Sequence, residues 1–529
     1  MRDYVLAILR ERARPPERPR GPPGTDTIDA PAPPSSEHPA GVGVIKPTYH
    51  PRLTNDDLAP LRDQNWSWYN IFAFWMSDVH SVGGYVTAGS LFALGLTSWQ
   101  VFICLIVGIS IVLFFCNLVA KPSQRTGVPF PVICRSVFGV LGANVPAVIR
   151  GLVAVAWYGI QTYLASAALD ILLVRVWPGL APYGDVAQHG FLGLSTLGYF
   201  TFALLWVLQA AVFWTGMDTI RRFIDFCGPA VYVVMVVLCG YLLAKAGWSV
   251  NLDLSTNHLS GGAVISTMCA ATALVVSYFS GPMLNFGDFS RYGRTFADVK
   301  KGNFWGLPVN FTMFSVLTVL TAAATLPVYG ELITDPVKTV GRIDNTFAIV
   351  LAALTFTTAT IGINIVANFV SPAFDFSHVS PQKISWRTGG MIAAVGSVLI
   401  TPWNLYKNPD TIHYTLDTLG AFIGPLFGVL ICHYYLVHKQ KVAIDDMFTM
   451  AESGVYHYRK GVNLAAVGAT AIAAVIAIAC VFVPGINQAT DYSWFIGCGI
   501  GFVAYFLLAR ATGVASLLDD REGDDVVVG

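Results

Sequence analysis

The sequence SDVHSVGG, residues 77–84, interrupts the first long apolar segment of the chain in its middle. The segment runs from about residue 66 to about residue 95 and is otherwise mostly apolar. An ionisable residue inside a membrane helix is costly, at least about 2.5 kcal/mol for an Asp at mid-helix. Irregular backbone persists at that depth only where it is buried in protein or lines a cavity. The stretch therefore predicts a membrane helix that is broken beside a polar site.

The composition of the whole chain agrees with a membrane location. Of the 529 residues, 54% are hydrophobic and 12% are charged, and the mean hydropathy is +0.58. The charged fraction is about half that of a soluble globular protein. The formal net charge of zero argues against nucleic acid as a partner. We therefore expect an all-α membrane protein with the lipid bilayer as its surroundings.

Apolar segments of about 20 residues recur along the chain, and each is long enough to cross a bilayer. We expect about twelve spans, at residues 66–95, 99–120, 143–176, 196–215, 223–247, 262–289, 303–327, 344–370, 388–403, 415–437, 461–484 and 491–510.

The connections that follow even-numbered spans carry most of the Lys and Arg residues, and cationic loops are retained in the cytoplasm during insertion. We therefore expect a multi-pass protein of the cytoplasmic membrane with both termini in the cytoplasm. The cationic residues of these connections are Lys121, Arg125, Arg135, Arg221, Arg222, Arg291, Arg294, Lys300, Lys301, Lys383, Arg387, Lys439, Lys441, Arg459 and Lys460.

A second interruption is predicted in the sixth span, where SYFSGP at residues 277–282 leads into NFGD at residues 285–288. The two broken spans are five spans apart and so cross in opposite directions. This spacing predicts two five-helix repeats of inverted topology around a solute site near the midplane. We place the repeats at residues 61–250 and 251–440, followed by two additional helices at 441–512. A kink packed against neighbouring helices stays the alternative for each break.

The two ends of the chain are expected to be cytoplasmic tails. Residues 1–60 are rich in arginine and proline, so we expect them to be disordered, and residues 513–529 form the second tail. The apolar run at residues 5–9 is followed by arginines and prolines rather than by a cleavage site, which argues against a signal peptide. The nine cysteines lie mostly within apolar runs, so we expect core residues and no disulfides.

Ionisable residues inside spans are candidates for ion coupling. Asp78 and His80 lie in the broken first span, and a position facing a wet cavity would make them a proton or cation relay. A satisfied structural pair is the alternative. Asp288 is a third candidate, although it lies near the cytoplasmic end beside Arg291, where an interfacial ion pair explains it equally well.

Two pairs of side chains at helical spacing are candidates for solute binding. Trp157 and Gln161 in the third span are one turn apart and share a face. An indole can stack on a flat ring, and a primary amide can both donate to and accept from its edge. Asn364 and Asn368 repeat the spacing in the eighth span, the equivalent position in the second repeat. Packing between helices is the alternative, because buried amides need partners of some kind.

Two other functional classes, a membrane-embedded enzyme and a channel, fit the sequence less well. A membrane-embedded enzyme needs a nucleophile with its base or a metal cluster, and the chain contains neither GxSxG nor HExxH. A membrane channel stays the alternative from a different class, although a continuous pore does not require paired broken helices. We therefore expect a secondary transporter of a small polar solute that works as a monomer, with no organic cofactor and no resident metal.

Seven motifs in order across residues 60–510 resemble those of the nucleobase:cation symporter-1 family, the carriers of uracil, cytosine, purines, allantoin and hydantoins. The resemblance implies a LeuT-like fold of two inverted five-helix repeats plus two further helices, which agrees with the plan above. The motifs are NWS at 65–67, GLTSWQ at 95–100, FPVICRSVFG at 130–139, WYGIQ at 157–161, NFGDF at 285–289, NFVSPA at 368–373 and GPL at 424–426.

The resemblance also implies particular binding residues. In the sodium–hydantoin member the solute ring lies between a Trp on span three and a Trp on span six. A Gln on span three and an Asn on span eight bind its edge. The matching positions here are Trp157, Phe279, Gln161 and Asn368, and that member's binding Gln on span one is matched by Ser81. Phe279 offers less stacking area than Trp, and Ser81 is shorter than Gln.

The coupling ion is where the sequence departs most from that member. There, two adjacent hydroxyl residues on span eight complete the Na⁺ shell, and the matching positions here are Gly362 and Ile363. Neither has a side-chain oxygen, whereas a hard cation is bound by several oxygens. We therefore expect H⁺ as the coupling cation, with Asp78 and His80 as proton candidates. The expected solute is a planar nucleobase-like heterocycle such as uracil, with allantoin or a hydantoin as the alternative.

Overall fold

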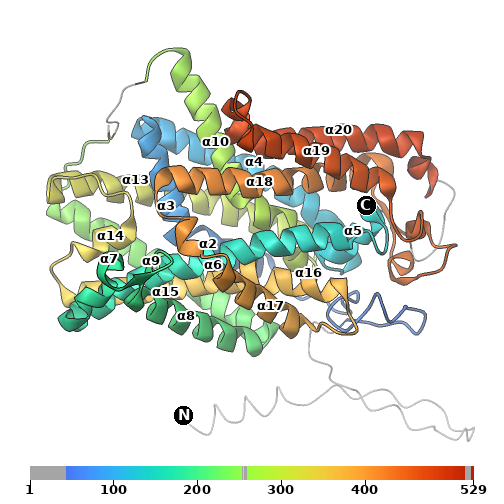
Figure 1. The fold of residues 1–529 in the computed structure, drawn as a ribbon, viewed down its shortest axis with the longest axis horizontal. Coiled ribbons are helices and arrows are strands. Elements are labelled where there is room, and N and C mark those ends of the chain that lie inside the picture. The colour runs from blue at the N-terminus through green and yellow to red at the C-terminus, as the bar shows by residue number, and fades with distance from the viewer. Residues whose placement is uncertain (1–42, 81, 253, 255–258, 519–525, 529) are drawn as a thin grey trace, which may run out of the picture. The chain divides into compact units, whose positions relative to one another are not determined.

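A computed structural model describes residues 43–529, except 81, 253, 255–258, 519–525 and 529 (Figure 1). The tail predicted at residues 1–42 lies outside the described residues. The described chain is mainly helical and carries two small antiparallel sheets. In the first, β1 (Gly190–Phe191) pairs with β2 (Leu194–Ser195), and in the second, β3 (Lys441–Ala443) pairs with β4 (Val526–Val528). The predicted all-α class is therefore confirmed.

Ten helices in the described part of the chain are long and apolar enough to cross a membrane. The broken first span and α17 (Trp386–Leu399) are shorter and complete the predicted set. The ten are α4 (Ser98–Thr126), α6 (Asn144–Val176), α8 (Thr196–Trp214), α9 (Met217–Lys245), α10 (Gly262–Leu284), α12 with α13 (Phe296–Phe304 and Asn310–Tyr329), α15 with α16 (Thr346–Ile365 and Ser371–Val379), α18 (Pro409–Cys432), α19 (Leu464–Phe482) and α20 (Ser493–Ala511).

The helices pack in an order that brings distant spans together. The long helix α6 contacts α15, α16 and α17, whereas α4 contacts α10, and α2 (Trp68–Val79) contacts α9 and α12. The last three spans, α18, α19 and α20, pack against one another, as Figure 1 shows in orange and red. The division of the chain into repeats at residues 61–250 and 251–440 stays a prediction.

The first span is broken where the sequence predicts it. Helix α2 ends at Val79, and His80 caps it with a non-helical backbone at φ −84° and ψ 37°. A second helix, α3 (Val82–Ser90), carries the span onward. Ser81 lies between the two helices and outside the described residues.

The sixth span does not break at residues 277–282, so that prediction is wrong. Helix α10 continues through the stretch to Leu284, and the chain leaves it at Asn285 before the short α11 (Gly287–Ser290). A proline removes one helical hydrogen bond. Pro282 falls in the last turn of α10, where its effect on the helix is small, and the helix ends two residues after it. The interruption therefore comes one turn later than predicted.

Residues 43–60 are packed rather than disordered, which corrects the predicted boundary of the first tail. Tyr49 and Leu53 are buried, and the Tyr49 ring stacks on Phe448 with centroids 4.3 Å apart. Lys46 forms an ion pair with Asp445 at 2.7 Å. The apolar residues of this segment give it enough buried surface to order against the helices, in contrast to a chain rich only in arginine and proline.

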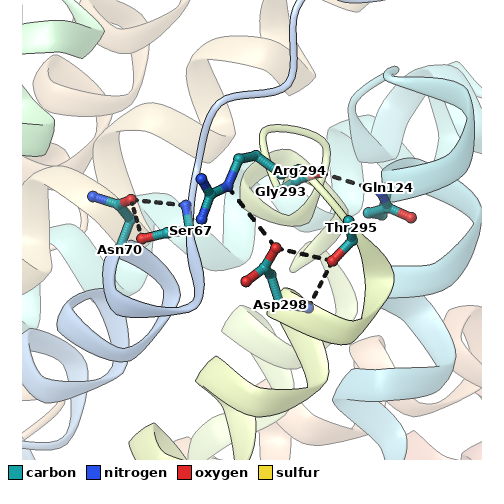
Figure 2. A network of polar contacts seen from close by, with 7 residues as sticks. All are labelled: Ser67, Asn70, Gln124, Gly293, Arg294, Thr295 and Asp298. Carbon is teal, nitrogen blue, oxygen red and sulfur yellow. Dashed lines mark hydrogen bonds and ion pairs between the residues drawn. The ribbon is translucent and has the colours of Figure 1, made fainter.

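Figure 2 shows how the beginnings of α2 and α12 are held beside the end of α4. Ser67 and Asn70 form a capping box at the start of α2, and Thr295 caps α12 through the Asp298 N–H at 3.0 Å. Between these caps, the Gln124 side chain on α4 donates to the Gly293 carbonyl at 3.2 Å. Because the Trp66 backbone also forms hydrogen bonds with Tyr292 and Arg294, spans one, two and seven are tied together at one end.

Candidate solute-binding site

A small cavity lies where spans one, three, six and eight meet. It has a volume of about 20 Å³, which is room for about one water molecule. The sequence-predicted residues Asp78, Trp157 and Gln161 line it together with Asn368. The other lining residues are Tyr278, Pro282, Ile363 and Ala367. The structure thus brings four predicted site residues from three separate spans to one small cavity.

The aromatic partner of Trp157 is Tyr278 and not Phe279. The Trp157 and Tyr278 rings meet edge to face with centroids 5.2 Å apart. Phe279 instead packs against Phe311 at 5.6 Å and lines a separate apolar cavity. Successive residues of a helix point about 100° apart, so only one of the two can face Trp157 while α10 stays helical. The expected pairing of Trp157 with Phe279 is therefore corrected.

Gln161 lies against the second half of the broken span. A Cβ on Gly83 of α3 would come within 2.8 Å of the Gln161 Nε2 atom, so the glycine makes room for the amide. Nε2 lies 3.5 Å from the Tyr278 hydroxyl, at the limit of a hydrogen bond. The Oε1 atom is buried, and no described residue donates to it. This oxygen is free to accept from a solute.

Asn368 lines the cavity, whereas Asn364 lies behind it. Asn368 is part of a π-helical turn, Val366–Val370, that joins α15 to α16, and such turns often occur at functional sites. Its Nδ2 donates to the Asn364 Oδ1 at 3.0 Å. The Asn364 Nδ2 in turn contacts the Tyr158 carbonyl and the side chains of Thr162 and Gln209. Asn364 therefore supports the site rather than lining it.

Asp78 and His80 face different surroundings although only one residue separates them. Asp78 is buried at the cavity, and neither of its carboxyl oxygens has a hydrogen-bond partner among the described residues. His80 is buried between the Tyr85 hydroxyl, 2.9 Å from Nδ1, and the Asn310 Oδ1, 3.0 Å from Nε2. His80 is therefore a polar side chain with its own structural partners, as the alternative reading of this pair expected. Asp78 is the carboxyl that faces the solute cavity.

Asp288 lies outside the cavity in a hydrogen-bonded cluster. The Phe130 backbone N–H donates to its Oδ1 at 2.8 Å, and the Asn285 amide donates to its Oδ2 at 3.2 Å. The expected partner Arg291 donates instead to the carbonyls of Asp57 and Ala59, both at 2.9 Å. Among the described residues Asp288 therefore forms no direct ion pair.

Sequence reasoning missed four residues of this region. Tyr278 is adjacent to a predicted position, and Gly83 belongs to the quoted break. Thr162 and Gln209 are buried polar side chains in apolar runs, and that feature alone could have marked them, since such groups need partners in lipid. In the described part of the chain no group of three or more His, Cys, Asp or Glu side chains could hold a metal ion.

The sequence is similar to one known protein family and to several named permeases. A family model described as a permease for cytosine/purines, uracil, thiamine and allantoin matches residues 60–497. An allantoin permease of Bacillus subtilis is 34% identical over 470 residues, which cover 88% of this chain and 95% of the relative. A purine-uracil permease of Arabidopsis thaliana is 30% identical over 485 residues, covering 88% and 80%.

The fold was compared with solved structures. Mhp1, a nucleobase-cation-symport-1 family transporter in a closed conformation with bromovinylhydantoin bound, matches with a TM-score of 0.71 at 22% identity, covering 87% of this chain and 96% of that one. A Na⁺-coupled sialic acid symporter matches with a TM-score of 0.55 at 12% identity, covering 85% and 90%. These likenesses confirm the predicted LeuT-like fold. The matched family model and the similar permeases show that the chain is a multi-pass membrane transporter that belongs to the nucleobase:cation symporter-1 family.

Proposed function

We propose that this transporter imports allantoin, a flat and uncharged ureide ring, across the cytoplasmic membrane by H⁺-coupled symport. The observation that carries the proposal is the meeting of Trp157, Gln161, Asn368 and Asp78 at one small cavity. An indole face, two amides and a carboxyl are the groups needed to stack a ring, bind its edge and exchange a proton. The B. subtilis and Escherichia coli relatives named as an allantoin permease and a putative allantoin permease support this choice of solute.

Uracil is the second candidate solute. Its ring also alternates N–H and C=O groups along one edge, so the same amides could bind it. The Arabidopsis relative named as a purine-uracil permease supports uracil as a second candidate. Both rings are larger than the one water molecule that the cavity can hold, so its lining side chains must move apart for either to enter.

The proposed mechanism is alternating access around this cavity. In a fold with inverted repeats, one group of helices rocks against the other and exposes a fixed midplane site to each side in turn. Asp78 lies on the broken span, and a buried carboxyl without a partner is stable only when it is neutral or binds a cation. Uptake of a proton by Asp78 together with the solute would therefore couple the two movements.

The test is uptake of radiolabelled allantoin by the purified protein in liposomes with an imposed proton gradient. We expect saturable uptake that rises with an inward proton gradient, competition by unlabelled uracil and hydantoin, and counterflow of preloaded solute. Counterflow distinguishes a carrier from a channel. Saturable uptake that follows a sodium gradient at fixed pH and ignores the proton gradient would contradict H⁺ coupling, and no saturable uptake of either solute would refute the proposal.

A further inference from the structure

Behind Asn368 lies a chain of hydrogen bonds that crosses from span eight to spans three and four. The Asn364 Nδ2 is 2.7 Å from the Gln209 Oε1 of α8 and 2.9 Å from the Thr162 hydroxyl of α6. The Gln209 Nε2 lies 3.2 Å from the same Thr162 hydroxyl. Each of these side chains is buried, and only Asn368 lines the cavity.

Two backbone carbonyls fix the direction of every bond in this chain. A carbonyl oxygen can only accept, so the atom facing it must be a donor. The Tyr158 carbonyl is 3.0 Å from one end of the Asn364 amide, which must therefore be its nitrogen. The Leu205 carbonyl is 3.2 Å from one end of the Gln209 amide and identifies that nitrogen in the same way.

The fixed direction continues to the cavity. Because the Asn364 nitrogen is held by the Tyr158 carbonyl, its oxygen faces Asn368 and can only accept. The Asn368 amide must then turn its own nitrogen toward Asn364, at 3.0 Å. The Asn368 oxygen is thereby left for the cavity. The opposite rotamer would place two oxygens against each other and leave a buried donor without a partner, which membrane proteins avoid.

We infer that Thr162, Gln209 and Asn364 are positioning residues that make Asn368 a hydrogen-bond acceptor toward the solute. The site then selects rings that present an N–H group at this position and discriminates against rings that carry a methyl group or a carbonyl there. The inference rests on the proposed function, because it names the chemistry that the same site prefers. It assigns to span four a part in specificity although that span does not line the cavity.

The test combines one substitution with a panel of competitors. Thr162→Val removes the hydroxyl with little change of shape, whereas Thr162→Ser keeps the hydroxyl and removes the methyl group. Thr318→Val is the matched control, because the Thr318 hydroxyl is also buried but, among the described residues, bonds only to the Phe314 carbonyl of its own helix, at 2.8 Å. Uptake of labelled allantoin is measured with hydantoin, 1-methylhydantoin, 3-methylhydantoin and 2-thiohydantoin as competitors.

In the wild type, one of the two N-methyl competitors should be weaker than hydantoin by about tenfold or more, since it loses a buried hydrogen bond. The thio competitor, which keeps both N–H groups, should change less. In Thr162→Val the KM for allantoin should rise by about tenfold while Vmax per folded transporter is kept, and the penalty for N-methylation should shrink, because the Asn364 amide loses one partner and holds Asn368 less firmly. Thr162→Ser and Thr318→Val should behave as the wild type.

A structural role of Thr162 alone would lower the amount of folded protein without changing the KM or the N-methyl penalty. Wild-type transport of allantoin together with an unchanged KM and penalty in Thr162→Val would overturn this inference and leave the proposed function standing. Equal competition by hydantoin and both N-methyl derivatives in the wild type would also overturn it. A wild type that transports neither allantoin nor uracil would refute the proposed function and this inference with it.

Discussion

The two walls of the solute cavity differ in how their polar groups are satisfied. The wall built by spans three and eight is backed by the chain of Thr162, Gln209 and Asn364, in which each amide is hydrogen-bonded. The wall built by spans one and six carries Asp78, whose two oxygens have no partner among the described residues. The first wall is thus backed by a completed network and has the Gln161 Oε1 as a free acceptor, whereas the second wall contains a carboxyl that no described residue compensates.

This difference indicates how the work of transport is divided. A satisfied network in a low-dielectric interior holds its members in one geometry, which suits recognition of a ring edge. An unpartnered buried carboxyl is costly and persists in membrane proteins where it binds a proton, a cation or another group during function. We therefore expect substitutions on the first wall to change affinity and selectivity, and substitution of Asp78 to change coupling.

Asp78→Asn should have the largest effect. The amide keeps the shape of the carboxyl but cannot take up a proton, so accumulation of solute against its gradient should be lost while counterflow is largely retained. Both are measured in liposomes with and without a proton gradient. Asp170→Asn is the control, because that carboxyl does not line the cavity and already accepts from the Thr201 hydroxyl at 2.6 Å. Accumulation by Asp78→Asn that still follows the proton gradient would break the proposed division between the walls.

Trp157→Ala should have the next largest effect, and this effect should be on the affinity for the solute. Stacking of a base on an aromatic side chain contributes about 1–3 kcal/mol, so the KM should rise by about 5- to 150-fold, while Trp157→Phe should lie between. Saturation curves of allantoin uptake measure this. Trp99→Ala serves as the control, since Trp99 is 68% exposed at the start of α4. A KM for Trp157→Ala equal to that of the wild type would show that the indole does not contribute to solute binding.

Gly362→Ser combined with Ile363→Thr should have an intermediate effect on ion use. A Cβ on Gly362 would make ordinary contacts, 3.7 Å from Cys227 and 3.8 Å from Phe223, so a small hydroxyl side chain fits. The two oxygens would give a hard cation ligands that it lacks at present, and uptake should gain a sodium dependence that the wild type does not show. Gly362→Ala with Ile363→Val is the control, because it makes nearly the same changes in size without adding oxygens. Equal sodium stimulation of the wild type and the double variant would show that these oxygens are not needed.

The sequence predicted much of this fold, because hydropathy and charged loops report directly on membrane spans. The spans, the break at residues 77–84 and the meeting of Trp157 with Asn368 all followed from local patterns and one resemblance. The sixth span was not predicted correctly, because a proline in a last turn and a proline in a helix centre look alike in sequence. The packing of residues 43–60 depends on distant partners such as Phe448, which no local pattern reveals.

The misplacement of one aromatic ring follows from the misplaced break. If α10 had unwound at residues 277–282, either Tyr278 or Phe279 could have faced Trp157, and the family pattern favoured Phe279. Because the helix continues, its geometry selects Tyr278. The prediction that both Asn364 and Asn368 line the site differs from the structure for a related reason. Helical spacing places the two side chains on one face but does not say which of them reaches the cavity.

Substitution at these two neighbouring positions should therefore give the smallest and most selective effects. Tyr278→Leu removes the ring that would contact the solute opposite Trp157 and should raise the KM by about 2- to 12-fold, the range of an aromatic contact worth about 0.5–1.5 kcal/mol. Phe279→Leu makes the same change in the separate apolar cavity and should lower the thermal stability of the purified protein through lost packing. Its KM should stay close to that of the wild type. If Phe279→Leu raised the KM and Tyr278→Leu did not, the transporting form would use the other ring, and α10 would have to turn during the cycle.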